Sequence, residues 1–264
     1  MAGKDVTQGQ SKGGTMSRLR ELTSGRWATI GKVVLVLILL IWPLAYQNSY
    51  AMSVMTQAGL YAILAIAVGL ILGQAGQLSF GHSAFYGIGA YVCGLLVIKF
   101  GVPTFVAWIA GGAAAGLIAL VVGRPVLKLK YFYLALATIG LGQIFLAIVN
   151  EVKWVGAAYG FGGVSPLNLF GFEFDTYLRK YYMVWVVALI ILLFTARLLK
   201  YRVGRALRGL AVSEIAASTL GVRTANWKLW AFVFNAVYCG IAGGLFAFVF
   251  SAVAPGSFSF AASV

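Results

Sequence analysis

The segment GQAGQLSFGHSAFYGIGAY, from Gly73 to Tyr91, connects two long apolar runs. It is rich in glycine, and it carries neutral polar side chains where a membrane helix is expected: Gln74, Gln77, Ser79, His82 and Ser83. Glycine lets membrane helices approach each other closely. Irregular backbone at membrane depth is tolerated only where protein buries it or water lines it. We therefore expect a tightly packed helix entry at the centre of a membrane protein, beside a pathway.

The composition of the whole chain agrees with a membrane protein. Hydrophobic residues make up 61% of the 264 residues and charged residues 10%, against about half and about a quarter in a soluble domain. A spanning helix needs about 20 apolar residues. The fold class is therefore predicted to be all-α, a polytopic helical membrane protein with about seven spans: Val33–Tyr46, Ala51–Leu72, Leu78–Ile98, Pro103–Gly123, Tyr131–Asn150, Tyr181–Ala196 and Leu229–Val253.

Lysine and arginine predict the orientation of these spans. They gather in residues 1–32, in the connection Arg124–Lys130 and in the loop of about residues 197–228, whereas the connection Glu151–Lys180 has three acids and three bases. Basic connections favour the cytoplasmic side, so the N-terminus is predicted to be cytoplasmic. We expect a disordered basic segment over residues 1–32 and a membrane domain over residues 33–264. Alternatively, the first apolar run and the NSYA that follows it resemble a cleaved secretory signal, whose loss would leave the other six spans unchanged.

The net charge of +14 is explained by these flanking residues, which favour anionic membrane lipid. No soluble basic domain is predicted, so nucleic acid is not an expected partner. Cys93 and Cys239 both fall in predicted spans and are expected to be buried free thiols.

The predicted spans contain no Asp, Glu, Lys or Arg well inside them, which argues against a proton- or sodium-driven pump. The sole histidine, His82, has no second histidine or carboxylate near it in sequence, so neither a metal site nor an enzyme is expected. Neutral groups remain for a polar solute, and the predicted pathway residues are Gly76, Gln77, Ser79, Gly81, His82 and Gly89. The alternative is helix packing with internally satisfied polar groups, an ambiguity that Gln143, Asn150 and Asn235 share.

The loop after Ala196 contains SEIAASTLG, which predicts a short helix. Ser213 suits the N-cap, Glu214 places negative charge in the first turn, and Gly221 suits a left-handed C-cap. Two turns alone are unstable in water, so this helix must dock on a surface. Ala216 and Ala217 would offer a partner a small, smooth face. The alternative is an amphipathic linker that lies on lipid head groups.

Together these stretches resemble a known family. GQAGQLSFGHSAFYGIGAY resembles the signature of permease subunits of bacterial branched-chain amino-acid ABC importers, in the LivM-like branch. The run YRVGRALRGLAVSEIAASTLGVRTANWKLWAFVFNAVYCGIAGGLFAFVFSAVAPGSFSF resembles the cytoplasmic loop and following span of that family. YFYLALATIGLGQI and YGFGGVSPLNLFGF fit the segments between them. The resemblance covers the chain from about Ala51 to its end.

The resemblance implies a permease subunit in the inner (plasma) membrane. Its implied partners are a second permease subunit, two cytoplasmic ATP-binding subunits and a periplasmic or extracellular substrate-binding protein. The chain itself would hold no cofactor, because ATP is used by the partner subunits. Glu214, Ala216, Ala217 and Gly221 match the pattern of the helix that couples such permeases to their ATPase.

Three departures accompany the resemblance. VGAAYG stands where members often carry a Thr-Gly-Gly element, and GLAV precedes Glu214 where an arginine and acids are common. Relatives continue beyond APGSFSFAASV, so we expect an incomplete member. The expected substrates are branched-chain or other neutral amino acids. The alternatives are a urea or short-amide permease of the same type, and an ATP-independent channel or facilitator for a neutral solute.

Overall fold

The computed structural model describes Leu39 and residues 41–43, 48–129, 131–169, 171–219 and 223–258. The chain divides into two compact units, Met1–Met52 and Ser53–Val264. In the first unit residues 41–43 are helical, and the Asn48 side chain accepts a hydrogen bond from the backbone N–H of Tyr50 at 3.1 Å. The predicted basic segment over residues 1–32 lies outside the described residues, and so does most of the predicted span Val33–Tyr46.

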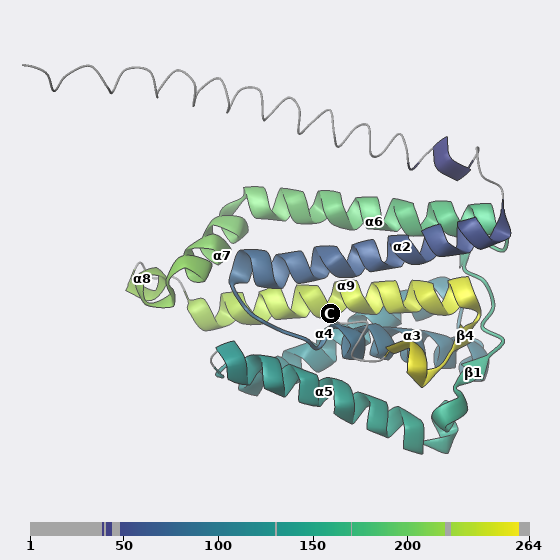
Figure 1. Cartoon of the computed structure of the whole chain (residues 1–264), viewed down its shortest axis with the longest axis horizontal. Helices are drawn as coiled ribbons and strands as arrows, with labels where there is room; N and C mark the ends of the chain where they lie inside the picture. The colour runs from purple at the N-terminus through teal and green to yellow at the C-terminus, as the bar shows by residue number, and fades with distance from the viewer. Residues whose placement is uncertain are drawn as a thin grey trace, which may run out of the picture. The chain divides into compact units, whose positions relative to one another are not determined.

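The second unit is a bundle of long helices (Figure 1). Its elements in chain order are α2 (Ser49–Val68, which starts in the first unit), the π-helical turn η1 (Gly69–Gln74), α3 (His82–Phe100), α4 (Thr104–Val126), α5 (Tyr131–Glu151), η2 (Lys153–Val155), η3 (Ala157–Tyr159), β1 (Phe161–Gly162), β2 (Asn168–Leu169), β3 (Phe172–Glu173), α6 (Tyr177–Lys200), α7 (Arg202–Val212), α8 (Glu214–Thr219), α9 (Thr224–Phe250), β4 (Ala252–Val253) and η4 (Pro255–Phe258).

Six helical segments within the described residues are long and apolar enough to cross a membrane: Ser49–Gln74, His82–Phe100, Thr104–Val126, Phe132–Glu151, Tyr177–Lys200 and Thr224–Phe250. The prediction of a polytopic helical membrane protein is therefore confirmed. Each of the six overlaps one predicted span, and the seventh prediction falls mostly on residues outside the description.

Glycines set the distance between α3, α4 and α9 at the centre of the bundle. A methyl group added to Gly89 of α3 would collide with the backbone of Gly240 in α9. One added to Gly111 of α4 would lie 2.7 Å from the carbonyl oxygen of Gly89. The indole of Trp108 donates a hydrogen bond to the backbone oxygen of Ile241 at 2.9 Å. Close backbone approach of this kind replaces the hydrophobic driving force that helices lack inside lipid.

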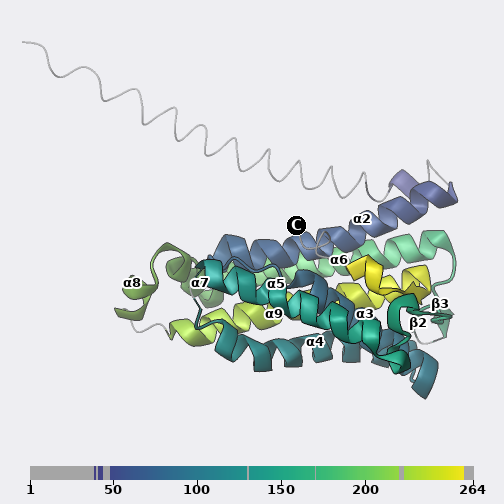
Figure 2. The ribbon, with the colours of Figure 1, turned by 60° about the horizontal axis from the view of Figure 1, so that its bottom comes forward.

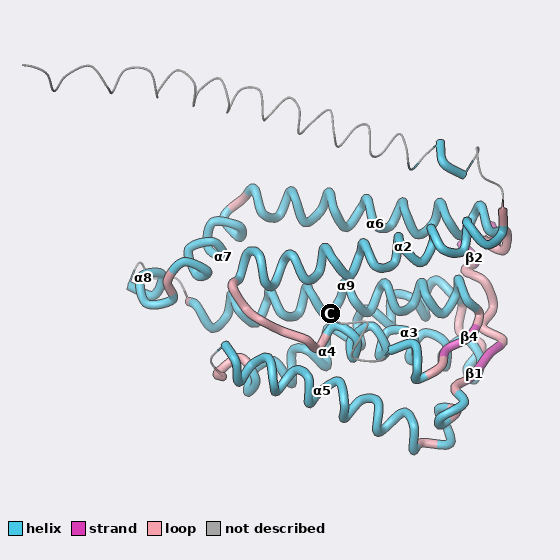
Figure 3. The backbone as a smooth tube through the Cα atoms, in the orientation of Figure 1, coloured by secondary structure: helices cyan, strands magenta, loops and turns pink. Residues whose placement is uncertain are grey.

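The short strands lie at the end of this unit away from α8 (Figure 3). β1 pairs antiparallel with β4, and β2 with β3. Beyond β4 the chain folds back, and the ring of Phe258 packs edge-on against Tyr86, Tyr91 and Phe246. The all-α prediction missed these strands, because two residues are too few to show the alternation by which a strand is recognised.

Several predicted boundaries are wrong. α3 begins at His82 rather than at Leu78. The predicted span Tyr181–Ala196 is too short, because α6 runs from Tyr177 to Lys200 and includes the charged residues at both ends. Long cationic side chains can lie along apolar surface while their charge stays in water, so the first charge does not mark the end of a helix.

Candidate functional site

The candidate pathway begins where the second span loses its regular backbone. After η1 the chain turns at Gly76, whose φ of 63° is left-handed, and the N–H of Gln77 reaches back to the carbonyl of Ile71 at 3.1 Å. A left-handed residue is easiest for glycine, which has no Cβ. Residues 76–81 are not helical, and Figure 3 shows this linker running back from the end of η1 to the start of α3. The segment is therefore a broken helix pair.

α5 supports the backbone of this linker. The N–H of Phe80 donates to the hydroxyl of Thr138 at 3.0 Å, and that hydroxyl donates to the carbonyl of Ala135 at 2.9 Å. The N–H of Gly81 lies 3.4 Å from the Ser79 hydroxyl. Side chains thus satisfy backbone groups that a helix would have paired internally, as irregular backbone inside a membrane requires.

Buried polar side chains line the break. Gln77, Ser79 and His82 are 5%, 6% and 1% exposed, and Asn235 of α9 is fully buried. The Asn235 amide lies beside the His82 ring, but within the described residues neither ring nitrogen has a hydrogen-bond partner, and the same is true of the Gln77 amide atoms and Asn235 Nδ2. Buried groups left unpaired in this way are rare and costly. They offer neutral donors and acceptors to a polar solute or to water.

The structure brings five of the six predicted pathway residues into this one place: Gly76, Gln77, Ser79, Gly81 and His82. Gly89 lies farther along α3 in the contact with Gly240 of α9, so its position there is that of a packing residue. Asn235 was not among the predicted pathway residues. The sequence gives no sign that α9 passes His82, because 152 positions separate the two residues.

The second candidate site is the α7–α8 segment, at the opposite end of the bundle from the short strands (Figure 1). Ser213, in extended conformation, separates the two helices, and its carbonyl accepts the first bond of α8, from the Ala217 N–H at 3.0 Å. The carboxylate of Glu214 forms an ion pair with Lys228 of α9. The predicted short helix is confirmed over Glu214–Thr219. Gly221 lies outside the described residues, and so does the side chain of Ala216.

The position of Ala217 differs from the expected open alanine face. α8 packs on α7 and α9, and Ala217 is 5% exposed. The exposed residues of α8 are Glu214, Ser218 and Thr219.

α7 itself was not predicted. Its signal was present in the i, i+4, i+7 spacing of Val203, Leu207 and Leu210, of which Leu207 and Leu210 are buried.

Comparison with known proteins identifies the family. The family described as "Branched-chain amino acid transport system / permease component" matches residues 50–264. The chain belongs to this family. Among the curated proteins, this permease-family chain is 31% identical over 255 residues to the LivM permease protein of the high-affinity branched-chain amino acid transport system of Salmonella typhimurium, and 32% identical to that of Escherichia coli K12. A family of transport permeases agrees with the prediction that the chain is not an enzyme.

The similarity to LivM covers 88% of this permease-family chain and 60% of LivM, so the chain spans about 60% of the length of these relatives. LivH of Salmonella typhimurium, a second permease protein of such a system, is 26% identical over 221 residues, which are 76% of this chain and 70% of LivH. No solved structure matches the chain.

Proposed function

We propose that the chain is a membrane-spanning permease subunit of an ATP-binding-cassette importer for branched-chain or other neutral amino acids. The observation that carries this proposal is one chain that combines a broken helix lined by neutral polar groups with a short docked helix at one end of the bundle (Figure 1). Membership of the permease family and the similarity to LivM and LivH support the substrate class.

The break around Gln77 and His82 is the proposed solute pathway. Its buried amide and imidazole atoms are uncharged hydrogen-bonding groups without partners in the described residues. Such groups can exchange hydrogen bonds with the amino and carboxyl groups of a zwitterion, and they place no net charge in the bilayer, where charge is costly. The pathway residues proposed are Gly76, Gln77, Ser79, Gly81 and His82, with Asn235 of α9 added.

α8 is the proposed coupling element. Glu214, Ala216, Ala217 and Gly221 are the positions that resemble the coupling pattern, and the exposed part of α8 would face a cytoplasmic ATP-binding subunit. α7 touches the linker through Ala211 and Gly76. A movement of α8 when two ATP-binding subunits close on ATP could therefore reach the pathway. The energy would come from the different affinities of the two ATPase states.

The proposed assembly also contains a second permease subunit and an external substrate-binding protein, in the inner membrane. We place the N-terminus and the α7–α8 end in the cytoplasm, because the α4–α5 connection and α7 carry the basic residues. Two exposed positions at opposite ends test this: Val212 is 88% and Tyr159 94% exposed. The native cysteines are buried, so a membrane-impermeant maleimide should label Tyr159→Cys in intact cells and Val212→Cys only after permeabilisation. The reverse pattern would invert the proposed orientation.

Uptake separates the importer from its alternatives. Cells that carry this chain with its ATP-binding subunits should accumulate labelled leucine, and accumulation should stop when the ATP-binding subunits are inactivated. Leucine entry that survives inactivation would indicate a facilitator. Accumulation of labelled urea without leucine would indicate the amide-transporting alternative.

A further inference from the structure

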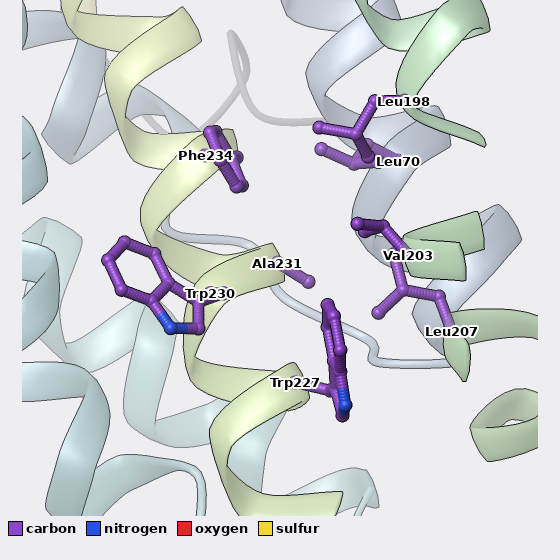
Figure 4. Close-up of a pocket in the computed structure, with 8 residues that line it drawn as sticks. All are labelled: Leu70, Leu198, Val203, Leu207, Trp227, Trp230, Ala231 and Phe234. Atoms are coloured by element: carbon purple, nitrogen blue, oxygen red, sulfur yellow. The ribbon is translucent and has the colours of Figure 1, made fainter. Parts of the chain in front are cut away.

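An apolar pocket of about 330 Å³ lies between α6, α7, α9 and η1, apart from the polar break. Figure 4 shows Phe234, Ala231 and Trp227 of α9 on one side of it. The side chains facing them are Leu70 of η1, Leu198 of α6, and Val203 and Leu207 of α7. Trp230 completes the lining. No lining residue is charged, and the only polar side-chain atoms are the two indole nitrogens.

The pocket is open to the outside of the described chain on one side. Leu70, Leu207 and Ala231 are each 2% exposed and form the inner wall, whereas Trp230 is 52% exposed. Leu198 belongs to the last turn of α6 and Trp227 to the first turn of α9, so the pocket lies at the end of the spans, where a bilayer changes from hydrocarbon to head groups. Tryptophan is enriched at that depth.

The charges around the pocket have one sign. Arg197 and Arg208 are the sequence neighbours of lining residues Leu198 and Leu207, and Lys200 ends α6. Arg208 donates to the backbone oxygen of Leu199 at 3.4 Å, which holds it against this end of α6. No acidic residue occurs between Asp175 and Glu214, and among the described residues Glu214 pairs with Lys228. Arg197 and Lys200 are exposed and have no carboxylate partner in the described chain.

We propose that this pocket binds one acyl chain of an anionic phospholipid, whose phosphate is held by Arg197, Lys200 and Arg208. An apolar slot at interface depth accepts the hydrocarbon tail, and the cations beside it select an anionic over a zwitterionic head group, as basic pockets beside spanning helices do. The pocket reaches α7 through Val203 and Leu207, so the lipid would brace the helix that leads to α8. The proposal does not depend on which solute is transported.

The test uses Trp227 and Trp230 as reporters. The assembled complex is placed in phosphatidylcholine nanodiscs with rising fractions of brominated phosphatidylglycerol or brominated phosphatidylcholine, and tryptophan quenching is recorded. The signal of a Trp227→Phe/Trp230→Phe variant is subtracted to remove the other tryptophans. Pocket quenching should saturate at a several-fold lower fraction of the phosphatidylglycerol probe. Equal curves for the two probes would overturn the proposal.

Two variants with matched controls separate tail from head group. Ala231→Phe, which fills the pocket, should abolish the saturable quenching of Trp230, whereas Ala225→Phe, at an exposed position of α9, should not. Arg197→Gln/Lys200→Gln should raise the half-saturating fraction about fivefold for each removed cation. Arg124→Gln/Lys128→Gln removes two exposed cations from the α4–α5 connection and should leave it unchanged. Absence of lipid quenching at both reporters in the wild-type complex would show that protein covers the pocket, which also overturns the proposal.

Discussion

Gly76 lies directly against the backbone of Ala211: a Cβ added to Gly76 would sit 3.2 Å from the Ala211 Cα. The contact joins the linker before α3 to α7, the helix that leads into α8. Two segments separated by 135 positions in the sequence thus meet without a side chain on the glycine between them. The proposed pathway and the proposed coupling element are therefore in physical contact, and a shift of one must be accommodated by the other.

Replacement of Gly76 by alanine should impair transport. Gly76 has a left-handed φ of 63°, which costs an alanine about 1–2 kcal/mol, and the new methyl group would press on Ala211. We expect leucine uptake to fall while ATP hydrolysis by the complex continues. Ala211→Gly should restore part of the uptake, because it relieves the contact but not the dihedral strain. Gly73→Ala is the control, since nothing lies within 4 Å of a Cβ there. Equal loss in both single variants would contradict a role for this contact.

The α3–α9 crossing should be intolerant of even one methyl group. Gly89→Ala would place that group against the Gly240 backbone, which cannot move away as a flexible side chain could. Overpacking a close contact costs about 1–3 kcal/mol, so we expect a lower unfolding temperature in detergent. Gly140→Ala of α5 meets no atom within 4 Å and should be neutral or mildly stabilising. An unchanged unfolding temperature for Gly89→Ala would show that these helices are not held this close.

Asn235 allows transport and stability to be separated. Its Nδ2 is buried without a partner in the described residues, so Asn235→Leu removes an unpaired polar atom and should change stability by about 1 kcal/mol or less. If the break around His82 conducts a polar solute, uptake should fall strongly in the same variant. Thermal unfolding and labelled-leucine uptake, measured on one preparation, decide the matter. A large loss of stability with normal specific uptake would identify Asn235 as a packing residue.

The Glu214–Lys228 pair is expected to position α8 rather than to stabilise the fold. The two side chains are 53% and 19% exposed, and pairs near the surface contribute about 0.2–1 kcal/mol. Glu214→Lys should therefore leave unfolding almost unchanged and reduce ATP-driven uptake. The swapped variant Glu214→Lys/Lys228→Glu should recover uptake if the carboxylate acts only through Lys228. Failure of the swap would indicate that Glu214 contacts the ATP-binding subunit itself.

Cross-linking should distinguish the faces of α8. Ser218 is exposed, whereas Ala217 is buried within this chain. Ser218→Cys, carrying a short photo-cross-linker, should capture an ATP-binding subunit in the assembled complex, and Ala217→Cys should react poorly. Capture from Ala217 with none from Ser218 would mean that α8 turns over when the complex assembles.

Much of the site could be predicted, because its residues are close together in the chain. Gln77, Ser79 and His82 share one short segment, and glycine with neutral polar groups amid apolar runs has few explanations in a membrane. The short helix from Glu214 was recognisable from its N-terminal residues. The exposure of α8 was not predictable, since the coverage of Ala217 depends on how α7 and α9 fold around it.

The sequence by itself determined that the chain is a multi-span helical membrane protein, where most spans lie, and which segment is broken, because hydrophobic length and local backbone preference are properties of neighbouring residues. The tertiary structure alone decided that Asn235 lies beside His82, that Gly76 meets Ala211, and that Gly89 is enclosed by Gly240. These contacts join residues far apart in the chain, and they depend on which faces of the helices meet. In a chain that is apolar around most of each helix, the side-chain pattern does not specify those faces, and the close fit of small residues does.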